Sequence, residues 1–156
     1  MKKILLLTLL FTFALQTVIG ANDWGKTGHR TTGEIAQKYL TKKAERRIIQ
    51  LLNGQSLAFV ANYADDIKSD SLYDKYYNWH FVNFPFESNY ESHPKSEKGD
   101  IIQGIDRCVN VLKSPNSTEE EKVFHLKMLV HFIGDLHQPV SYTHLTLPTM
   151  LAQCRS

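Results

Sequence analysis

The most informative part of the sequence is His131-Phe132-Ile133-Gly134-Asp135-Leu136-His137-Gln138-Pro139. Within it, His131 and Asp135 stand four positions apart. Residues with this spacing lie on one face of an α-helix, so both side chains can point at a single metal ion. Pro139 cannot continue a helix, and we expect the helix to end just before it. His137 lies six positions from His131, which points it away from the pair, and we expect it to form a hydrogen bond rather than join as a ligand.

Apolar residues recur at helical spacing over most of the preceding chain. They predict helices over 34–40, 44–52, 57–68, 101–112 and from Ser117 or Thr118 to His137. A glutamate three residues after either hydroxyl predicts a capping box for the last of these helices. Residues 73–85 are expected to form a short helix followed by an extended segment from Trp79 to Phe84, and 87–99 a polar loop. The pattern therefore predicts an all-α fold in a single domain.

The two ends of the chain differ from this pattern. Lys2 and Lys3 precede a short apolar run, which is typical of a signal peptide; cleavage after Gly20 or Ala21 predicts a signal over 1–21. Residues 140–149 resemble the translated transposase adapter of short-read sequencing libraries, so we expect 140–156 to be a non-native tail. The domain proper is then expected over 22–139, as the partial, N-terminal portion of a longer one.

Charge and cysteine content limit the possible functions. Without Lys2, Lys3 and Arg155, the 18 basic residues become 15 against 16 acidic ones, a net charge of about −1. Affinity for nucleic acid therefore cannot rest on a large basic surface, and bound divalent cations would have to supply the positive field.

Cys108 is the only cysteine before the tail, and we interpret it as a buried, small apolar residue rather than half of a disulfide.

Four motifs hold the remaining candidate functional residues. In chain order they are Trp24-Gly25-Lys26-Thr27-Gly28-His29, Tyr63-Ala64-Asp65-Asp66-Ile67-Lys68, Asn78-Trp79-His80-Phe81-Val82-Asn83 and the His131/Asp135 pair. As a set and in this order they resemble the S1/P1 nuclease family, whose relatives include zinc-dependent bacterial phospholipases C. The resemblance covers residues 24–139. It implies a mainly helical domain with three zinc ions that hydrolyses phosphodiester bonds in single-stranded RNA or DNA and leaves 5′ phosphates.

The resemblance also implies the metal ligands. They are Trp24, His29, Asp65, His80, His131 and Asp135. The free amine and carbonyl of Trp24 would bind one zinc together with His29, which requires trimming beyond the signal cleavage. The remaining four would hold a second zinc, with Asp135 bridging the two ions. Imidazole nitrogen and carboxylate oxygen are ligands that zinc accepts.

Catalytic and substrate-binding roles follow from the same resemblance. The metals would lower the pKa of a bridging water and neutralise the phosphate. Asp65 is expected to act in catalysis as well as in metal binding, and Lys68 to stabilise charge on the scissile phosphate. Phe81 would stack on a nucleobase and Asn83 would hydrogen-bond to it. Because stacking needs an unpaired base, this pair predicts a preference for single strands.

Each of these residues also has a purely structural interpretation. His29 can form a local hydrogen bond at a helix start, His80 and Phe81 can be packed core residues, and Lys68 can be surface. The His131/Asp135 pair can be an intrahelical ion pair. The structural interpretation as a whole describes a non-catalytic secreted helical domain, and a second enzymatic one describes a phospholipase C.

The sequence departs from the family pattern at its end. The family continues with a second histidine that binds the remaining zinc, and Ser141 stands at that position. Ligands for about two of the three ions are therefore present. We expect a secreted or periplasmic protein whose partner is single-stranded nucleic acid, with no stable protein partner and no membrane attachment after signal cleavage.

These departures predict that the 156-residue chain itself is inactive or poorly folded, whereas the protein encoded by an uninterrupted reading frame is an active nuclease. Hydrolysis of single-stranded DNA by the purified chain with zinc tests this. Robust turnover that a chelator abolishes would refute it.

Overall fold

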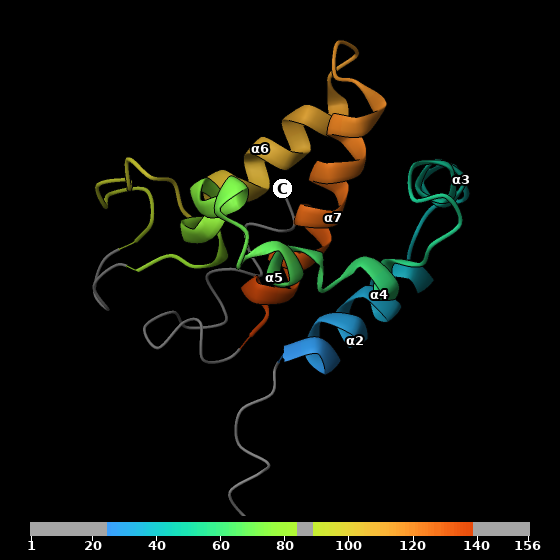
Figure 1. Ribbon diagram of the computed structural model, residues 1–156, viewed down its shortest axis with the longest axis horizontal. Coiled ribbons are helices and arrows are strands. Elements are labelled where there is room, and N and C mark those ends of the chain that lie inside the picture. Colours follow the sequence, from blue (N-terminus) through green and yellow to red (C-terminus); the bar gives the residue numbers. More distant parts are fainter. Residues whose placement is uncertain (1–24, 84–88, 139–156) are drawn as a thin grey trace, which may run out of the picture.

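The computed structural model describes residues 25–83 and 89–138, and every regular element among them is a helix (Figure 1). The expected signal peptide, Trp24 and the expected tail lie outside the described residues. The all-α prediction is confirmed. The α-helices are α2 (Gly25–Lys38), α3 (Lys42–Leu51), α4 (Leu57–Val60), α5 (Tyr63–Ile67), α6 (Ile101–Lys113) and α7 (Glu119–Leu136), and a 3-10 helix, η1 (Ser71–His80), precedes α6. Among the described residues, each helix is too short or too polar to span a lipid bilayer.

Helix α7 is the central element of the packing. It runs beside α6 as a helical hairpin, while α2, α4 and α5 cross its C-terminal half (Figure 1). Met128 and Phe132 of α7 are buried in one apolar cluster with Cys108 of α6. Leu126, on another face of α7, is buried in a second cluster with Leu57. Because α7 serves both clusters, its C-terminal half is enclosed on several sides, and this encloses His131 and Asp135 as well.

The predicted helix over 57–68 is broken in the structure into α4 and α5 at Ala61 and Asn62. Both residues are buried, and Asn62 adopts φ −95° and ψ 2°, outside the helical range. The Ala61 carbonyl oxygen accepts a hydrogen bond from the Nδ1 atom of buried His131, 2.8 Å away. At the break, a backbone carbonyl thus forms a tertiary hydrogen bond. The spacing of apolar residues along the chain cannot indicate such a contact.

Two other boundaries differ from prediction. Helix α2 begins at Gly25 rather than at residue 34. Its first turns are polar, and the hydroxyls of Thr31 and Thr32 donate to carbonyl oxygens one turn back, so no apolar periodicity marks them. The segment expected to become extended at Trp79 instead remains in η1 through His80, and an irregular stretch without assigned secondary structure begins at Phe81.

Two local predictions are confirmed: the capping box at the start of α7 and the burial of Cys108. The Thr118 hydroxyl accepts from the Glu121 amide at 3.1 Å, and the Glu121 carboxylate accepts from the Thr118 amide at 2.8 Å, which is a complete capping box. Cys108 is fully buried in the core, and burial raises the pKa of its thiol to about 12. It therefore behaves as a small apolar side chain.

The capping box predicts the effect of Thr118→Ala. Loss of the hydroxyl leaves the Glu121 amide without its acceptor, and we expect the free energy of unfolding to fall by about 1 kcal/mol. Urea unfolding followed by circular dichroism measures this. Ser117→Ala, which removes a neighbouring hydroxyl that does not cap α7, is the matched control; an equal loss in both variants would contradict the assignment.

Candidate metal centre

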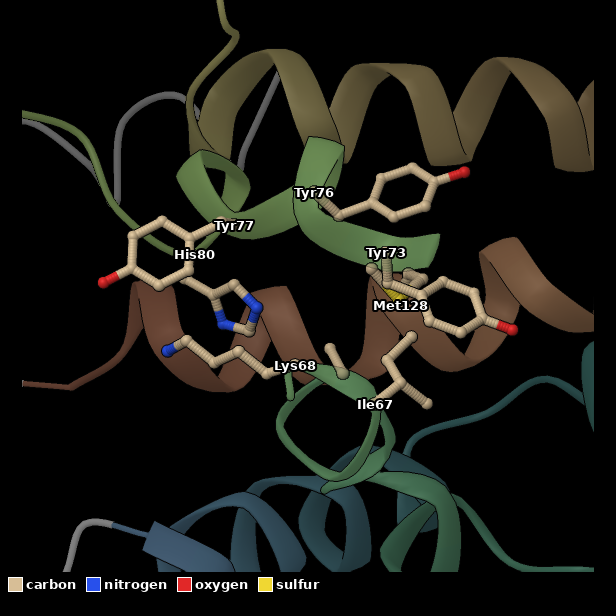
Figure 2. Close-up of a pocket in the computed structure, with 8 residues that line it drawn as sticks. Ile67, Lys68, Tyr73, Tyr76, Tyr77, His80 and Met128 are labelled. Carbon is tan, nitrogen blue, oxygen red and sulfur yellow. The ribbon is translucent and has the colours of Figure 1, made fainter. Parts of the chain in front are cut away.

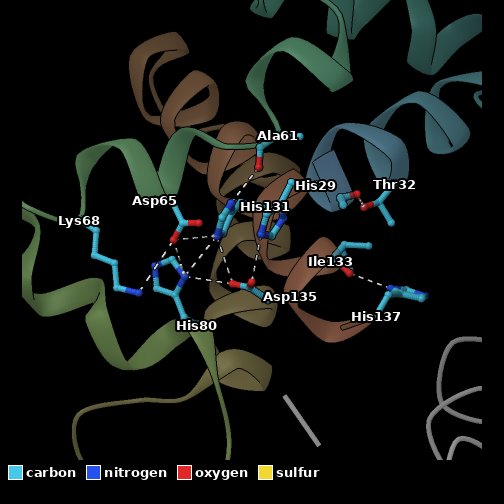
Figure 3. Close-up of polar contacts among 11 residues, drawn as sticks. His29, Thr32, Ala61, Asp65, Lys68, His80, His131, Ile133, Asp135 and His137 are labelled. Atoms are coloured by element: carbon cyan, nitrogen blue, oxygen red, sulfur yellow. Dashed lines mark hydrogen bonds and ion pairs between the residues drawn. The ribbon is translucent and has the colours of Figure 1, made fainter. Parts of the chain in front are cut away.

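Five of the predicted ligands converge from four separate elements (Figure 3). They are His29 on α2, Asp65 on α5, His80 at the end of η1, and His131 and Asp135 on α7. Three elements supply one of these residues each, and α7 supplies two. The cluster therefore forms only when these four elements are packed together.

Asp135 lies at the middle of this cluster. Its Oδ2 atom is 3.0 Å from His80 Nδ1 and 3.2 Å from His131 Nε2, and its Oδ1 atom is 3.3 Å from His29 Nε2. The two carboxylate oxygens thus face different imidazoles. Burial alone would raise the pKa of Asp135, but hydrogen bonds from the three histidines outweigh it and hold this pKa well below its usual range.

His131 is fixed in one orientation by a contact on its far side. Its Nδ1–H donates to the Ala61 carbonyl, so its Nε2 atom faces the cluster, 3.2 Å from His80 Nδ1. Burial lowers the pKa of His131, but the hydrogen bond to Asp135 and the charges of Asp135 and Asp65 raise it to a net value above the usual one. A backbone carbonyl bound to the far nitrogen is the arrangement that orients histidine ligands in metal sites.

Asp65 closes the cluster on its more open side. Its Oδ1 atom is 3.6 Å from His131 Nε2 and 3.9 Å from His80 Nδ1, and about a third of its side chain, 36%, is exposed. Asp135, in contrast, is buried. The cluster therefore has one carboxylate inside and one at the edge reached by solvent.

The donor set fits a metal ion. Two overlapping groups hold their ligand atoms within 4.8 Å of one another: His29, Asp65 and His131, and His80, His131 and Asp135. Three imidazoles and two carboxylates are nitrogen and oxygen donors of the kind zinc accepts. In addition, His29 Nδ1 is buried without a hydrogen-bond partner, an unsatisfied polar atom of the kind that marks a functional site.

The remaining predicted residues lie beside the cluster. Lys68 has its ammonium 3.9 Å from Asp65 Oδ1. Phe81 and Asn83 are on the surface immediately after His80, so Phe81 is not the packed core residue of the structural interpretation. His137 is exposed and its Nδ1 atom bonds to the Ile133 carbonyl, away from the cluster, as expected (Figure 3).

Gly134 is a contributor that sequence reasoning missed. A Cβ atom at this position would lie 2.4 Å from His29 Nδ1, a distance that real Cβ atoms do not adopt. The His29 ring is held between Gly134 and the His131 ring, with which it stacks at 3.9 Å and an interplanar angle of 17°. The glycine between Ile133 and Asp135 was a visible signal, because an interior helical glycine costs stability and calls for a packing reason.

We predict that Gly134→Ala disturbs the cluster. Its methyl group would have to displace His29, which should lower zinc affinity at least 10-fold and cost about 1–3 kcal/mol of stability, partly offset by the better helix propensity of alanine. Zinc calorimetry and urea unfolding measure the two effects. The matched control is Gly104→Ala on α6, whose Cβ would meet Trp79 instead, 3.0 Å away. Equal zinc affinity in the wild type and Gly134→Ala would contradict this role.

Comparison with known proteins agrees with the geometry. A family model described as S1/P1 nuclease matches residues 24–146. The chain is 31% identical to nuclease S1 of Aspergillus oryzae over 75% of its own length and 43% of that relative, and 32% identical to Endonuclease 3 of Arabidopsis thaliana over 80% and 46%. Nuclease P1 of Penicillium citrinum is 29% identical over 75% and 46%. The chain thus spans less than half the length of these relatives, and it belongs to the S1/P1 nuclease family.

Proposed function

We propose that the protein is a zinc-dependent nuclease that hydrolyses phosphodiester bonds in single-stranded RNA and DNA and leaves 5′ phosphates. The observation that carries this proposal is the convergence of His29, Asp65, His80, His131 and Asp135 in a chain of the S1/P1 nuclease family. The domain would act in the periplasm or outside the cell.

The proposed ligands divide between two ions. His80, His131 and Asp65 would hold one, His29 and the amine and carbonyl of Trp24 the other, and Asp135 would bridge them. The opposite orientation of the two Asp135 oxygens, toward His29 and toward His80 and His131, supports a bridging role. Zinc held by these residues would supply positive charge for the phosphate and lower the pKa of water.

Asp65 and Lys68 are the side chains proposed to act at the reacting phosphate. Asp65 lies at the open edge of the cluster, where its Oδ1 atom can accept a hydrogen bond from the attacking water and orient it. The Lys68 ammonium lies beside it, and its side chain is 39% exposed. A cation at this place can stabilise charge that develops on the phosphate oxygens.

Phe81 and Asn83 are proposed to bind the base. Both are exposed directly after His80, so a base stacked on the Phe81 ring would lie next to the cluster. A nearby aromatic ring and side-chain amide suit a nucleobase better than a lipid headgroup. This pair and the nuclease names of the relatives support a nuclease over a phospholipase C, and the buried histidine–carboxylate cluster supports an enzyme over a non-catalytic domain.

The proposal predicts that Asp135→Asn abolishes tight zinc binding. The amide keeps the shape of the side chain but loses the charge that faces three imidazoles, so zinc affinity should fall at least 10-fold. Isothermal calorimetry with Zn²⁺, and the visible spectrum of the Co²⁺ form, provide the measurement. Asp66→Asn is the matched control, because Asp66 bonds to Asn62 and Lys26 outside the cluster. A wild-type protein from the uninterrupted reading frame that holds no stoichiometric zinc would contradict the metal site.

The substrate class is tested on the protein encoded by the uninterrupted reading frame. Parallel assays with single-stranded DNA, single-stranded RNA and phosphatidylcholine vesicles are expected to give turnover with the nucleic acids, and loss of that turnover with a chelator. Turnover of phosphatidylcholine alone would instead support the phospholipase C.

A further inference from the structure

The 3-10 helix η1 divides its aromatic residues between two directions. Side chains three positions apart share an edge of a 3-10 helix. Tyr73, Tyr76 and Trp79 form one such row; the tyrosine rings contact Phe124 and the Trp79 ring contacts Phe132, so this row packs inward. Tyr77 belongs to the other row, one turn before His80. Figure 2 shows Tyr77, His80 and Lys68 grouped together, away from the rings of Tyr73 and Tyr76.

Tyr77 is therefore not explained by core packing. It is 52% exposed, and its described ring contacts are with Lys68, which is proposed to act at the phosphate, and with Phe81, which is proposed to bind the base. The Lys68 ammonium lies 5.1 Å from the centre of its ring, and the Phe81 ring lies 6.1 Å away at an interplanar angle of 82°. An exposed aromatic ring between a cation and a second exposed aromatic ring is the composition of a single-stranded nucleic-acid contact.

We propose that Tyr77 is a second base-binding platform, which takes the nucleotide next to the one on Phe81. This inference rests on the proposed function and adds a subsite to it. Because the two rings are nearly perpendicular, two bases stacked on them cannot stack on each other. The strand must turn at this step, and the phosphate between the two bases is then exposed to Lys68.

The relative orientation of the Tyr77 and Phe81 rings also excludes a duplex from stacking on both rings at once. Successive bases in a duplex are parallel and about 3.4 Å apart along the axis. Platforms 6.1 Å apart and nearly perpendicular match neither property. Tyr77 would thus strengthen the selection of single strands beyond what one stacking ring provides.

Binding of two thymidine probes to the zinc-loaded protein encoded by the uninterrupted reading frame tests the proposal. One probe is thymidine 5′-monophosphate, and the other is dithymidylate joined by a phosphorodithioate, which keeps the charge of the linkage and resists hydrolysis. We expect the wild type to bind the dinucleotide more tightly, and Tyr77→Ala to weaken dinucleotide binding about 10-fold while changing mononucleotide binding less than about twofold. Tyr77→Phe keeps the ring and should behave as the wild type.

Two controls separate the possible outcomes. Tyr39 lies in the connection between α2 and α3, and its side chain is 84% exposed. Tyr39→Ala should therefore change neither the mononucleotide nor the dinucleotide affinity. The salt dependence of dinucleotide binding should be equal in wild type and Tyr77→Ala, because a stacking residue neutralises no phosphate. A smaller salt dependence in Tyr77→Ala would mean that Tyr77 acts only by holding Lys68, and would overturn the platform.

Failure of this subsite is distinguishable from failure of the proposed function. If the wild type binds both probes equally, or if Tyr77→Ala weakens both equally, the second platform is overturned while zinc binding and mononucleotide binding stand. If the zinc-loaded wild type binds neither probe, the proposed function is overturned together with the platform. Thermal unfolding followed by circular dichroism confirms that each variant is folded before its affinity is interpreted.

Discussion

The burial of the Asp135 carboxylate is the constraint on which the rest of the structure depends. An ionised carboxylate without partners is very costly inside a protein. Here it is stabilised by three imidazoles that come from α2, η1 and α7. Each partner is far from Asp135 in sequence except His131, so the demand for hydrogen bonds at this one carboxylate ties the elements together. Without a metal ion, the three histidines stabilise the Asp135 carboxylate. The same imidazole nitrogens and carboxylate oxygens would be the ligands of a bound metal ion.

Uncharged groups hold the histidine rings of this cluster in position. The Ala61 carbonyl fixes the tautomer of His131, and this carbonyl lies at the break between α4 and α5. The same break starts α5 at Tyr63 and so sets where Asp65 lies. On the other side, Gly134 admits the His29 ring against the backbone of α7. A helix break and a helical glycine, each costly locally, are thus offset by what they allow at the site.

The sequence was informative where a local rule decides the outcome. Helical spacing located α3, α6 and α7 closely, and the Thr118–Glu121 pair predicted the α7 start because a capping box is a contact within four residues. The four-residue spacing of His131 and Asp135 predicted a shared face, and the resemblance to a family supplied the other candidate ligands. Spacing failed at Ala61 and Gly134, because the partner of each is a side chain remote in sequence.

The contrast between the two rows of η1 extends this argument from metal to substrate. An α-helix over the same residues would place Tyr77 and His80 on neighbouring rather than eclipsed positions, and the sequence alone gives no reason to expect the tighter helix. With three residues per turn, one row packs its partly buried aromatic rings against α7, and the other places Tyr77 on the same edge as His80. His80, which is proposed to bind zinc, and Tyr77, which is proposed to bind the second base, are therefore positioned by one short element. The inward row fixes the orientation of η1, and a substrate strand bound at Tyr77 would thereby be positioned relative to the cluster.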